Sequence, residues 1–252
     1  MKLFIDIGNA RIKWALQDDE NWTSGVPLVR GRKAFKDIAR PAWKELETPE
    51  RVVVSNVAGV DYEKSVRTWV KRRWKLDVEF LRPEPQCCGV RNAYEEPDRL
   101  GADRWASLLA AHALCRGPAV IVDCGTAITV DAIAGNGEHL GGLITPGMEL
   151  MRSSLSSAAP GVEADEDGQQ VSLLARSTGA AVSGGILYMT VSLIDRVFMD
   201  LQADLGRQTR LLLSGGDAGR VQPLLAAEPR LEPDLVLRGL AVYAEETAEC
   251  VS

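Results

Sequence analysis

The sequence is poor in the residues that usually hold structural metals or disulfide bonds. It contains only two histidines, His112 and His139, and no Cys-x-x-Cys or His-x-x-x-His pair, so we expect no zinc site. An odd number of cysteines, without a secretory context, indicates free thiols in a reducing cytoplasm. The five cysteines are Cys87, Cys88, Cys115, Cys124 and Cys250.

Long apolar runs and an excess of positive charge are also missing. The first apolar stretch is broken by Asp6, so the N-terminus does not resemble a signal peptide. No uninterrupted run approaches the roughly 20 apolar residues of a membrane span. The 29 basic residues are outnumbered by 35 acidic ones, and the net charge of −6 disfavours nucleic-acid binding. We therefore expect a cytoplasmic protein that binds neither membranes nor nucleic acid.

Two common nucleotide-binding motifs are absent as well. The chain has no GxxxxGK[ST] segment, which excludes a P-loop kinase, and no GxGxxG follows the first apolar stretch. What is present is an ordinary globular composition, with 46% apolar and 25% charged residues. A chain of 252 residues with this composition can bury a sizeable core without metals or disulfides.

Hydrophobic periodicity predicts the same order of elements twice, roughly β-β-β-α-β-α-β. This repeat suggests duplication of a whole α/β domain, and we expect domains over residues 1–117 and 118–252. The polar, acidic segment 160–170 is expected to be a loop. Strands are expected at 2–7, 11–17, 22–29, 51–55, 78–81, 119–123, 127–133, 138–144, 210–214 and 235–237. Helices are expected at 34–47, 62–74, 147–157, 179–201, 218–227 and 239–250.

Each half opens with a strand that ends in an Asp-x-Gly turn, DIGNARIK at 6–13 and DCGTAIT at 123–129. Glycine in such a turn lets backbone N–H groups approach a phosphate closely. Arg11 and Lys13 lie on the same side of their strand and can supply positive charge. Each motif alone is also compatible with an ordinary hairpin turn. Two such loops facing each other across a cleft would hold a polyphosphate.

Two further segments place glycine before a predicted helix. LSGGD at 213–217 ends a strand, and a helix N-terminus at that point favours an anionic ligand. The alternative is a plain turn with Asp217 as the N-cap. In GADRW at 101–105, Asp103 precedes a helical stretch, and on the residues alone its simplest role is also that of an N-cap.

Together these motifs resemble the type III pantothenate kinases, within the superfamily of acetate and sugar kinases, Hsp70 and actin. The resemblance covers almost the whole chain. It implies an α/β fold of two duplicated ribonuclease-H-like or actin-like domains, each with a central mixed sheet, and an interdomain cleft. The segments that carry it are DIGNARIK (6–13), NAYEEPDRLGADRW (92–105), DCGTAITVD (123–131), HLGGLITPGMELM (139–151), RSTGAA (176–181) and LSGGD (213–217).

The resemblance also implies an activity, the ATP-dependent phosphorylation of pantothenate to 4'-phosphopantothenate, which is the first step of coenzyme A biosynthesis. It implies Mg²⁺, K⁺ or NH₄⁺ as cofactors and a homodimer. Asp103 would be the catalytic base, Asp123 would bind the monovalent cation, and Asp6 would lie near Mg²⁺, directly or through water. The implied ATP contacts are Asp6, Ile7, Gly8, Asn9, Ala10, Arg11, Ile12, Lys13, Gly125, Thr126, Gly215 and Gly216. The implied pantothenate contacts are Tyr94, Gly101, Ala102, Asp103, Arg104 and Thr178.

One position departs from the family pattern, because Ala10 stands where a threonine or serine is usual. A lost hydrogen bond to a charged group costs about 1.5–3 kcal/mol unless another contact replaces it, so ATP binding is expected to be weaker. Two alternatives remain. One is another phosphotransferase or phosphatase of the superfamily, such as a sugar kinase or exopolyphosphatase. The other is a non-catalytic transcription accessory factor, which the intact Asp6, Asp103 and Asp123 disfavour.

Overall fold

The computed structural model describes residues 1–31, 33–159, 161–162 and 174–249, which form two compact units. Unit 1 combines Met1–Arg116 with Asn136–His139 and Asp234–Ser252, and unit 2 combines Gly117–Gly135 with Leu140–Pro233. The loop predicted over 160–170 lies almost entirely outside the described residues, as does Cys250.

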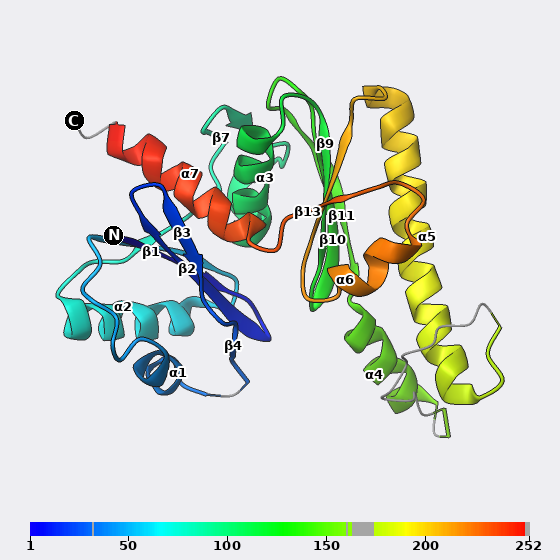
Figure 1. The fold of residues 1–252 in the computed structure, drawn as a ribbon, viewed down its shortest axis with the longest axis horizontal. Helices are drawn as coiled ribbons and strands as arrows, with labels where there is room; N and C mark the ends of the chain where they lie inside the picture. Colours follow the sequence, from blue (N-terminus) through cyan, green and yellow to red (C-terminus); the bar gives the residue numbers. More distant parts are fainter. Residues whose placement is uncertain (32, 160, 163–173, 250–252) are drawn as a thin grey trace. The chain divides into compact units, whose positions relative to one another are not determined.

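The sheet of unit 1 is an antiparallel meander extended by parallel strands (Figure 1). Its strand order is β3-β2-β1-β5-β6, with β4 also pairing with β2. In the β1–β2 register Asp6 lies opposite Lys13, so both side chains are on the same face of the sheet. The strands are β1 (Lys2–Ile7), β2 (Arg11–Asp18), β3 (Asn21–Ser24), β4 (Leu28–Val29), β5 (Arg51–Asn56) and β6 (Glu79–Phe80).

Helices cover both faces of this sheet. The helices α1 (Phe35–Ala42) and α2 (Val60–Trp74) pack on one face, and α3 (Ala102–Leu114) and α7 (Leu235–Glu249) cover the other (Figure 1). The helices α3 and α7 approach closely at Gly239, which has no side chain. A Cβ at this position would lie 1.8 Å from the carbonyl oxygen of Ala106. Three short elements lie between β6 and α3: β7 (Gln86–Cys87), β8 (Val90–Arg91) and the 3₁₀ turn η1 (Pro97–Arg99).

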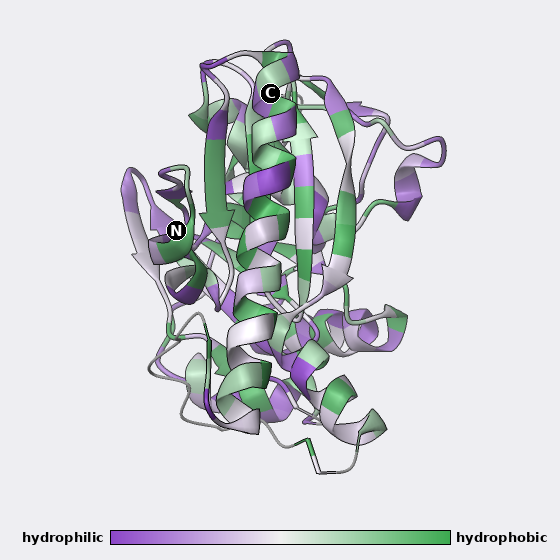
Figure 2. Ribbon diagram, turned by 90° about the vertical axis from the view of Figure 1, so that its right-hand side faces the viewer, coloured by the Kyte–Doolittle hydropathy of each residue, from purple (hydrophilic) through white to green (hydrophobic). Residues whose placement is uncertain are grey.

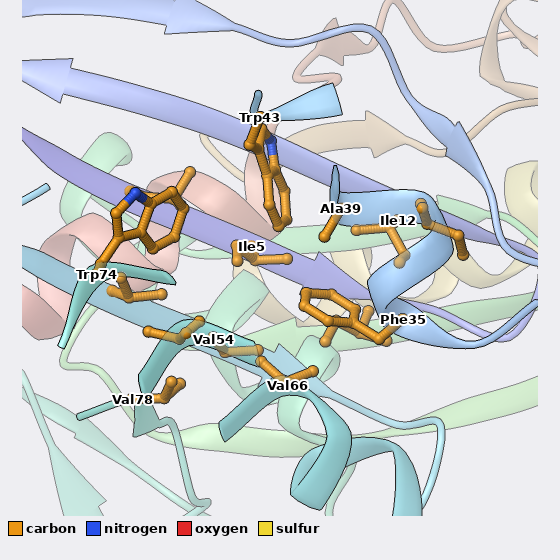
Figure 3. Close-up of a cluster of buried hydrophobic side chains, with 14 of the residues drawn as sticks. Ile5, Ile12, Phe35, Ala39, Trp43, Val54, Val66, Trp74 and Val78 are labelled. Carbon is orange, nitrogen blue, oxygen red and sulfur yellow. The ribbon is translucent and has the colours of Figure 1, made fainter. Parts of the chain in front are cut away.

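The hydrophobic core of unit 1 lies between its sheet and the pair α1 and α2. Apolar side chains of the strands, such as Ile5 and Val54, point toward Phe35 and Val66 of the two helices (Figure 3). Trp43, which follows α1, is only 1% exposed and its ring lies against those of four other aromatic residues. These are Trp14, Phe35, Trp69 and Trp74.

Unit 2 repeats the topology of unit 1, with strand order β11-β10-β9-β12-β13. The antiparallel meander β9–β11 is again extended by parallel strands, so the predicted duplication of a mixed-sheet α/β domain is confirmed. The strands are β9 (Ala119–Cys124), β10 (Ala127–Ile133), β11 (His139–Pro146), β12 (Arg210–Ser214) and β13 (Arg230–Leu231). The helices are α4 (Met148–Ala158), α5 (Thr178–Leu205), α6 (Ala218–Val221) and the 3₁₀ turn η2 (Gln222–Leu224).

Several predicted elements need correction. The strand expected at 235–237 is wrong, because these residues form the first turn of α7 and β13 is the last strand. A short buried apolar run fits a strand or a buried helix equally well. The strand expected at 22–29 is split into β3 and β4 around Pro27, and the helix expected at 34–47 ends at Ala42, just after Pro41.

The last helix also bears on the domain division. By its contacts α7 belongs to unit 1, where it packs on α3 and on β1. The proposed boundaries of 1–117 and 118–252 describe the duplication of the sequence, and they stay a prediction.

The helix α5 has the length and composition of a membrane span, which the sequence analysis did not expect. Most of its turns are apolar or pale in Figure 2, where it faces the viewer. Its buried residues, including Leu187, Ile194 and Phe198, belong to the hydrophobic core of unit 2. This packing is that of a core helix in a globular domain.

We expect Trp43→Ala to lower the free energy of unfolding by about 3–5 kcal/mol, since it removes a buried indole and leaves a cavity. Trp43→Phe is the matched control. It keeps an aromatic ring and removes the buried indole N–H, which has no hydrogen-bond partner among the described residues. Trp43→Phe should therefore lower the free energy of unfolding much less than Trp43→Ala. Urea denaturation followed by circular dichroism measures both, and equal losses would contradict this account of the core.

Candidate active site

The first Asp-x-Gly loop is a tight hairpin between β1 and β2. Residues 8–11 form the turn, which closes by a hydrogen bond of 3.0 Å from the Gly8 N–H to the Arg11 carbonyl oxygen. A Cβ on Gly8 would lie 3.2 Å from the same oxygen, so a residue with a side chain would be crowded at position 8. Asp6 is 8% exposed, whereas Ile7 and Ile12 are fully buried in the core. Of the predicted ATP contacts, the two isoleucines can therefore contribute only through their backbone.

Arg30 holds this loop in place, which the sequence did not indicate. Its Nη1 donates to the carbonyl oxygen of Asn9 at 2.9 Å, and its backbone N–H donates to the carbonyl oxygen of Ala10 at 2.9 Å. The guanidinium group also lies 4.7 Å from the ring centroid of Tyr62. With these carbonyl groups bound by Arg30, the loop keeps a fixed shape although Ala10 has no hydroxyl group.

A second group of predicted residues meets around Arg104, which is 6% exposed. Its Nη1 donates to the Tyr94 hydroxyl at 2.6 Å, and the guanidinium carbon lies 5.5 Å from the Tyr94 ring centroid. Tyr94 also contacts His139, whose ring stacks on it at 6.1 Å and whose Nδ1 accepts from the Ala93 N–H at 3.4 Å. Arg104 is thus a cation of fixed orientation, suited to binding a carboxylate or amide oxygen.

Asp103 lies in the first turn of α3. The N-cap position belongs to Gly101, so the alternative that Asp103 is the N-cap is wrong. Its Oδ1 accepts from the N–H of Arg104 at 2.8 Å. A Cβ on Gly101 would lie 2.5 Å from that oxygen, so glycine leaves room for the carboxylate. A negative charge in this turn is favoured by the helix dipole.

In unit 2, the second Asp-x-Gly loop is one residue shorter than the first. Asp123 lies opposite Thr129 in the β9–β10 register, and the Gly125 N–H donates to the Ala127 carbonyl oxygen at 3.1 Å. Gly147, at the start of α4, donates its N–H to the Thr126 carbonyl oxygen at 2.9 Å. A Cβ on Gly147 would lie 2.2 Å from the Gly125 carbonyl oxygen. The sequence predicted only that a helix begins at Gly147, and the structure shows that this residue also packs on the second loop.

The Gly215-Gly216 turn packs on the same loop. Gly215 has a φ of +98°, and a Cβ there would lie 2.4 Å from backbone atoms of Cys124. The Asp217 N–H donates to the Cys124 carbonyl oxygen at 3.0 Å. Burial, together with the nearby carboxylates of Asp123 and Asp217, raises the pKa of the Cys124 thiol to about 12. Two carboxylates, those of Asp123 and Asp217, thus lie near the end of β9.

The predicted site residues divide between the two units. The first loop and the group around Arg104 lie in unit 1, and the second loop, the glycine turn and Thr178 lie in unit 2. Thr178 is the first residue of α5, after the N-cap Ser177, whose hydroxyl accepts from the Ala180 N–H at 3.3 Å. Each unit thus presents its own Asp-x-Gly loop, and only unit 1 carries the Tyr94–Arg104 pair.

The described residues contain no cluster of three or more His, Cys, Asp or Glu side chains that could hold a metal alone. Mg²⁺ in phosphoryl-transfer enzymes is commonly bound by one or two carboxylates together with substrate phosphates and water. Asp6, largely buried at the end of β1, fits such a single-carboxylate role.

The duplicated mixed sheets, each with an Asp-x-Gly hairpin loop, define a protein of the actin-like fold class. A family model described as type III pantothenate kinase matches residues 2–200. A type III pantothenate kinase of Nitrosococcus oceani is 41% identical over 99% of this chain and 96% of its own length, and that of Nitrosospira multiformis is 39% identical over 99% and 93%. The chain belongs to the type III pantothenate kinase family.

Solved structures support the fold. A protein described as a Baf family transcriptional activator from Campylobacter jejuni aligns over 98% of this chain and 99% of its own, with a TM-score of 0.59 and 22% identity. A ROK hexokinase from Thermus thermophilus aligns over 98% and 99%, with a TM-score of 0.50 and 14% identity. These neighbours confirm the predicted actin-like fold class.

We expect Gly147→Ala to destabilise the protein by about 1–3 kcal/mol, the usual cost of forcing an extra methyl group into a packed site. Gly185→Ala in α5 is the control, because a methyl group there would meet no side chain or other element within 4 Å among the described residues. It should raise stability by about 0.5–1 kcal/mol through helix propensity. Thermal unfolding of both variants measures the difference, and an unchanged Gly147→Ala protein would show that the close contact with the second loop is unimportant.

Proposed function

We propose that this protein transfers the γ-phosphoryl group of ATP to the primary hydroxyl of pantothenate, giving 4'-phosphopantothenate and ADP in coenzyme A biosynthesis. The observation that carries the proposal is the arrangement at the start of α3, in a chain of this family. There a carboxylate (Asp103) is next to a buried arginine that is fixed by Tyr94.

Arg104 and Tyr94 would bind the acceptor. Pantothenate carries a carboxylate and an amide, and a guanidinium group of fixed orientation can donate two hydrogen bonds to either. The ring of His139 stacks on the ring of Tyr94 and limits its movement. Thr178 would add a contact from unit 2, through its position at the N-terminus of α5.

Asp103 would act as the general base. Its carboxylate accepts the proton of the pantothenate hydroxyl while the hydroxyl oxygen attacks the γ-phosphorus, and the bond to the β-phosphate oxygen breaks to release ADP. Phosphoryl transfer depends mainly on positioning and charge neutralisation, so the base needs only to be placed correctly. The hydrogen bond from the Arg104 N–H to Oδ1 limits the rotation of this carboxylate.

The two Asp-x-Gly loops would bind the triphosphate through backbone N–H groups, with Lys13 and Arg11 adding positive charge. Gly215 and Gly216 would lie against the adenosine. Asp6 would hold a divalent metal, which we propose to be Mg²⁺ and which would neutralise phosphate charge. Asp123 would bind K⁺ or NH₄⁺, in keeping with the acidic end of β9.

A non-catalytic role is the alternative, and the description of the Campylobacter neighbour as a transcriptional activator is the observation that favours it. At 22% identity that neighbour supports a common fold alone. The carboxylates at positions 6, 103 and 123 favour catalysis. ATP consumption that depends on pantothenate distinguishes the two functions.

We further propose a cytoplasmic homodimer that uses β11, the edge strand of the sheet in unit 2 over the described residues. Leu143 and Ile144 of the edge strand β11 are 46% and 61% exposed, and Leu150 and Leu155 of α4, which follows directly, are 47% and 40% exposed. Exposed apolar side chains on an edge strand and on the helix that follows it are typical of an interface. The family resemblance implies a homodimer, and a second copy is the occupant that we propose.

Asp103→Asn should lower kcat by about 10²–10⁴-fold, the usual contribution of a general base. The amide oxygen of asparagine can still accept from the Arg104 N–H, so folding should be unchanged, which circular dichroism checks. Coupled ADP release with Mg-ATP and K⁺, with and without pantothenate, measures the rate. Full pantothenate-dependent activity in the variant would remove Asp103 from the role of base.

Ile144→Lys should shift the protein from dimer toward monomer, with a dimer dissociation constant raised at least about tenfold, or about 1.4 kcal/mol. Val60→Lys is the control, because Val60 is 65% exposed but lies on α2 in unit 1. Light scattering over a range of concentrations reports both masses. A wild-type protein that stays monomeric at every concentration would contradict the proposed interface.

A further inference from the structure

Two adjacent cysteines form the tip of a hairpin in unit 1. Gln86 pairs with Arg91 and Cys87 with Val90, so Cys88 and Gly89 are a two-residue loop between β7 and β8. Their φ angles are +50° and +76°. Two positive φ angles are typical of a type I′ turn, in which asparagine, aspartate or glycine is usual at the first position. Cys88 therefore occupies a left-handed conformation that costs a non-glycine residue energy and that is often associated with function.

The two sulfur atoms are in contact. The Sγ atoms of Cys87 and Cys88 lie 3.3 Å apart, and both side chains are half-buried, so small reagents can reach them. When Cys87 is the thiolate, the Cys88 thiol can donate a hydrogen bond to it. This interaction lowers the pKa of Cys87 and raises the pKa of Cys88. The pair thus combines a thiol that ionises first with a second thiol placed to attack it.

We propose that Cys87 and Cys88 form a site of reversible exchange with low-molecular-weight disulfides of the glutathione class. The Cys87 thiolate attacks one sulfur of the disulfide, forms a mixed disulfide and releases one thiol. Cys88 then loses its proton and attacks Cys87 Sγ, which releases the second thiol and closes a vicinal disulfide. The protein loses two electrons and two protons, and the external disulfide is reduced to two thiols.

The geometry makes this site reversible. Adjacent Cα atoms are about 3.8 Å apart, whereas disulfides usually join Cα atoms about 4.4–6.8 Å apart. A ring closed between neighbours is therefore strained, and strained disulfides are readily reduced. The dithiol should be the resting form in a reducing compartment, and the ring should form only when the external disulfide is in excess.

The hairpin continues directly into the group around Arg104. The Arg91 N–H donates to the Gly137 carbonyl oxygen at 2.9 Å, and the Asn92 Oδ1 accepts from the Tyr94 N–H at 3.0 Å. Closing the ring changes the turn at the start of this path, so we expect the KM for pantothenate to rise several-fold in the oxidised protein. This expectation, unlike the exchange site itself, rests on the proposed function.

The test treats the reduced full-length protein with oxidised glutathione and maps its disulfides by mass spectrometry. We expect a peptide holding both Cys87 and Cys88 that is lighter by two hydrogens, and full recovery of the dithiol with reduced glutathione. Cys88→Ser should stop at the mixed disulfide on Cys87. Cys115→Ser should leave the exchange unchanged, and Cys124, buried with a pKa of about 12, should stay unmodified.

A protein that keeps both thiols, or that carries stable glutathione on each in place of the ring, would overturn the proposal. The same preparations are then assayed for pantothenate-dependent ADP release. If the Cys87–Cys88 disulfide forms but the KM for pantothenate is unchanged, oxidation of the hairpin does not affect the group around Tyr94. Absence of turnover in the reduced protein would overturn the proposed kinase activity. It would not affect the exchange site, because that site is tested by mass spectrometry alone.

Discussion

Backbone-to-backbone contact at glycine positions is the constraint on which this structure depends. Gly147 and Gly215 both lie against the second Asp-x-Gly loop, so closely that a single methyl group on either would overlap main-chain atoms. Gly239 brings α7 onto α3 in the same way. Loops that bind phosphate through N–H groups need a rigid backbone, and glycine contacts of this kind provide that rigidity without side chains.

The duplication explains how one fold supplies two different Asp-x-Gly loops. Both sheets place an aspartate at the end of the central strand and a glycine two residues later. The first loop is one residue longer and is held by Arg30, and the second is held by backbone contacts to Gly147 and Gly215. The Tyr94–Arg104 pair lies in unit 1, so the two units share an architecture while they differ in the side chains near their loops.

Much of this could be predicted from the sequence, because strand periodicity and the Asp-x-Gly repeats are local signals. The segment 101–105 was recognised by family resemblance, while its residues alone suggested only a helix cap. Arg30 and His139 were missed because their roles depend on contacts with residues distant in the chain, and no local pattern marks them. The run at 235–237 was assigned to a strand because its burial in a helix depends on α3, which lies far away in sequence.

The central claim is that pantothenate is the phosphoryl acceptor. The most direct measurement is the initial rate of ADP release by the wild-type protein with Mg-ATP and K⁺, with pantothenate, glucose or N-acetylglucosamine as acceptor, or with none. We expect ADP release with pantothenate alone and a phosphorylated product of matching mass. Equal ADP release without pantothenate, or faster release with a sugar, would contradict the account and point to another phosphotransferase of the same fold.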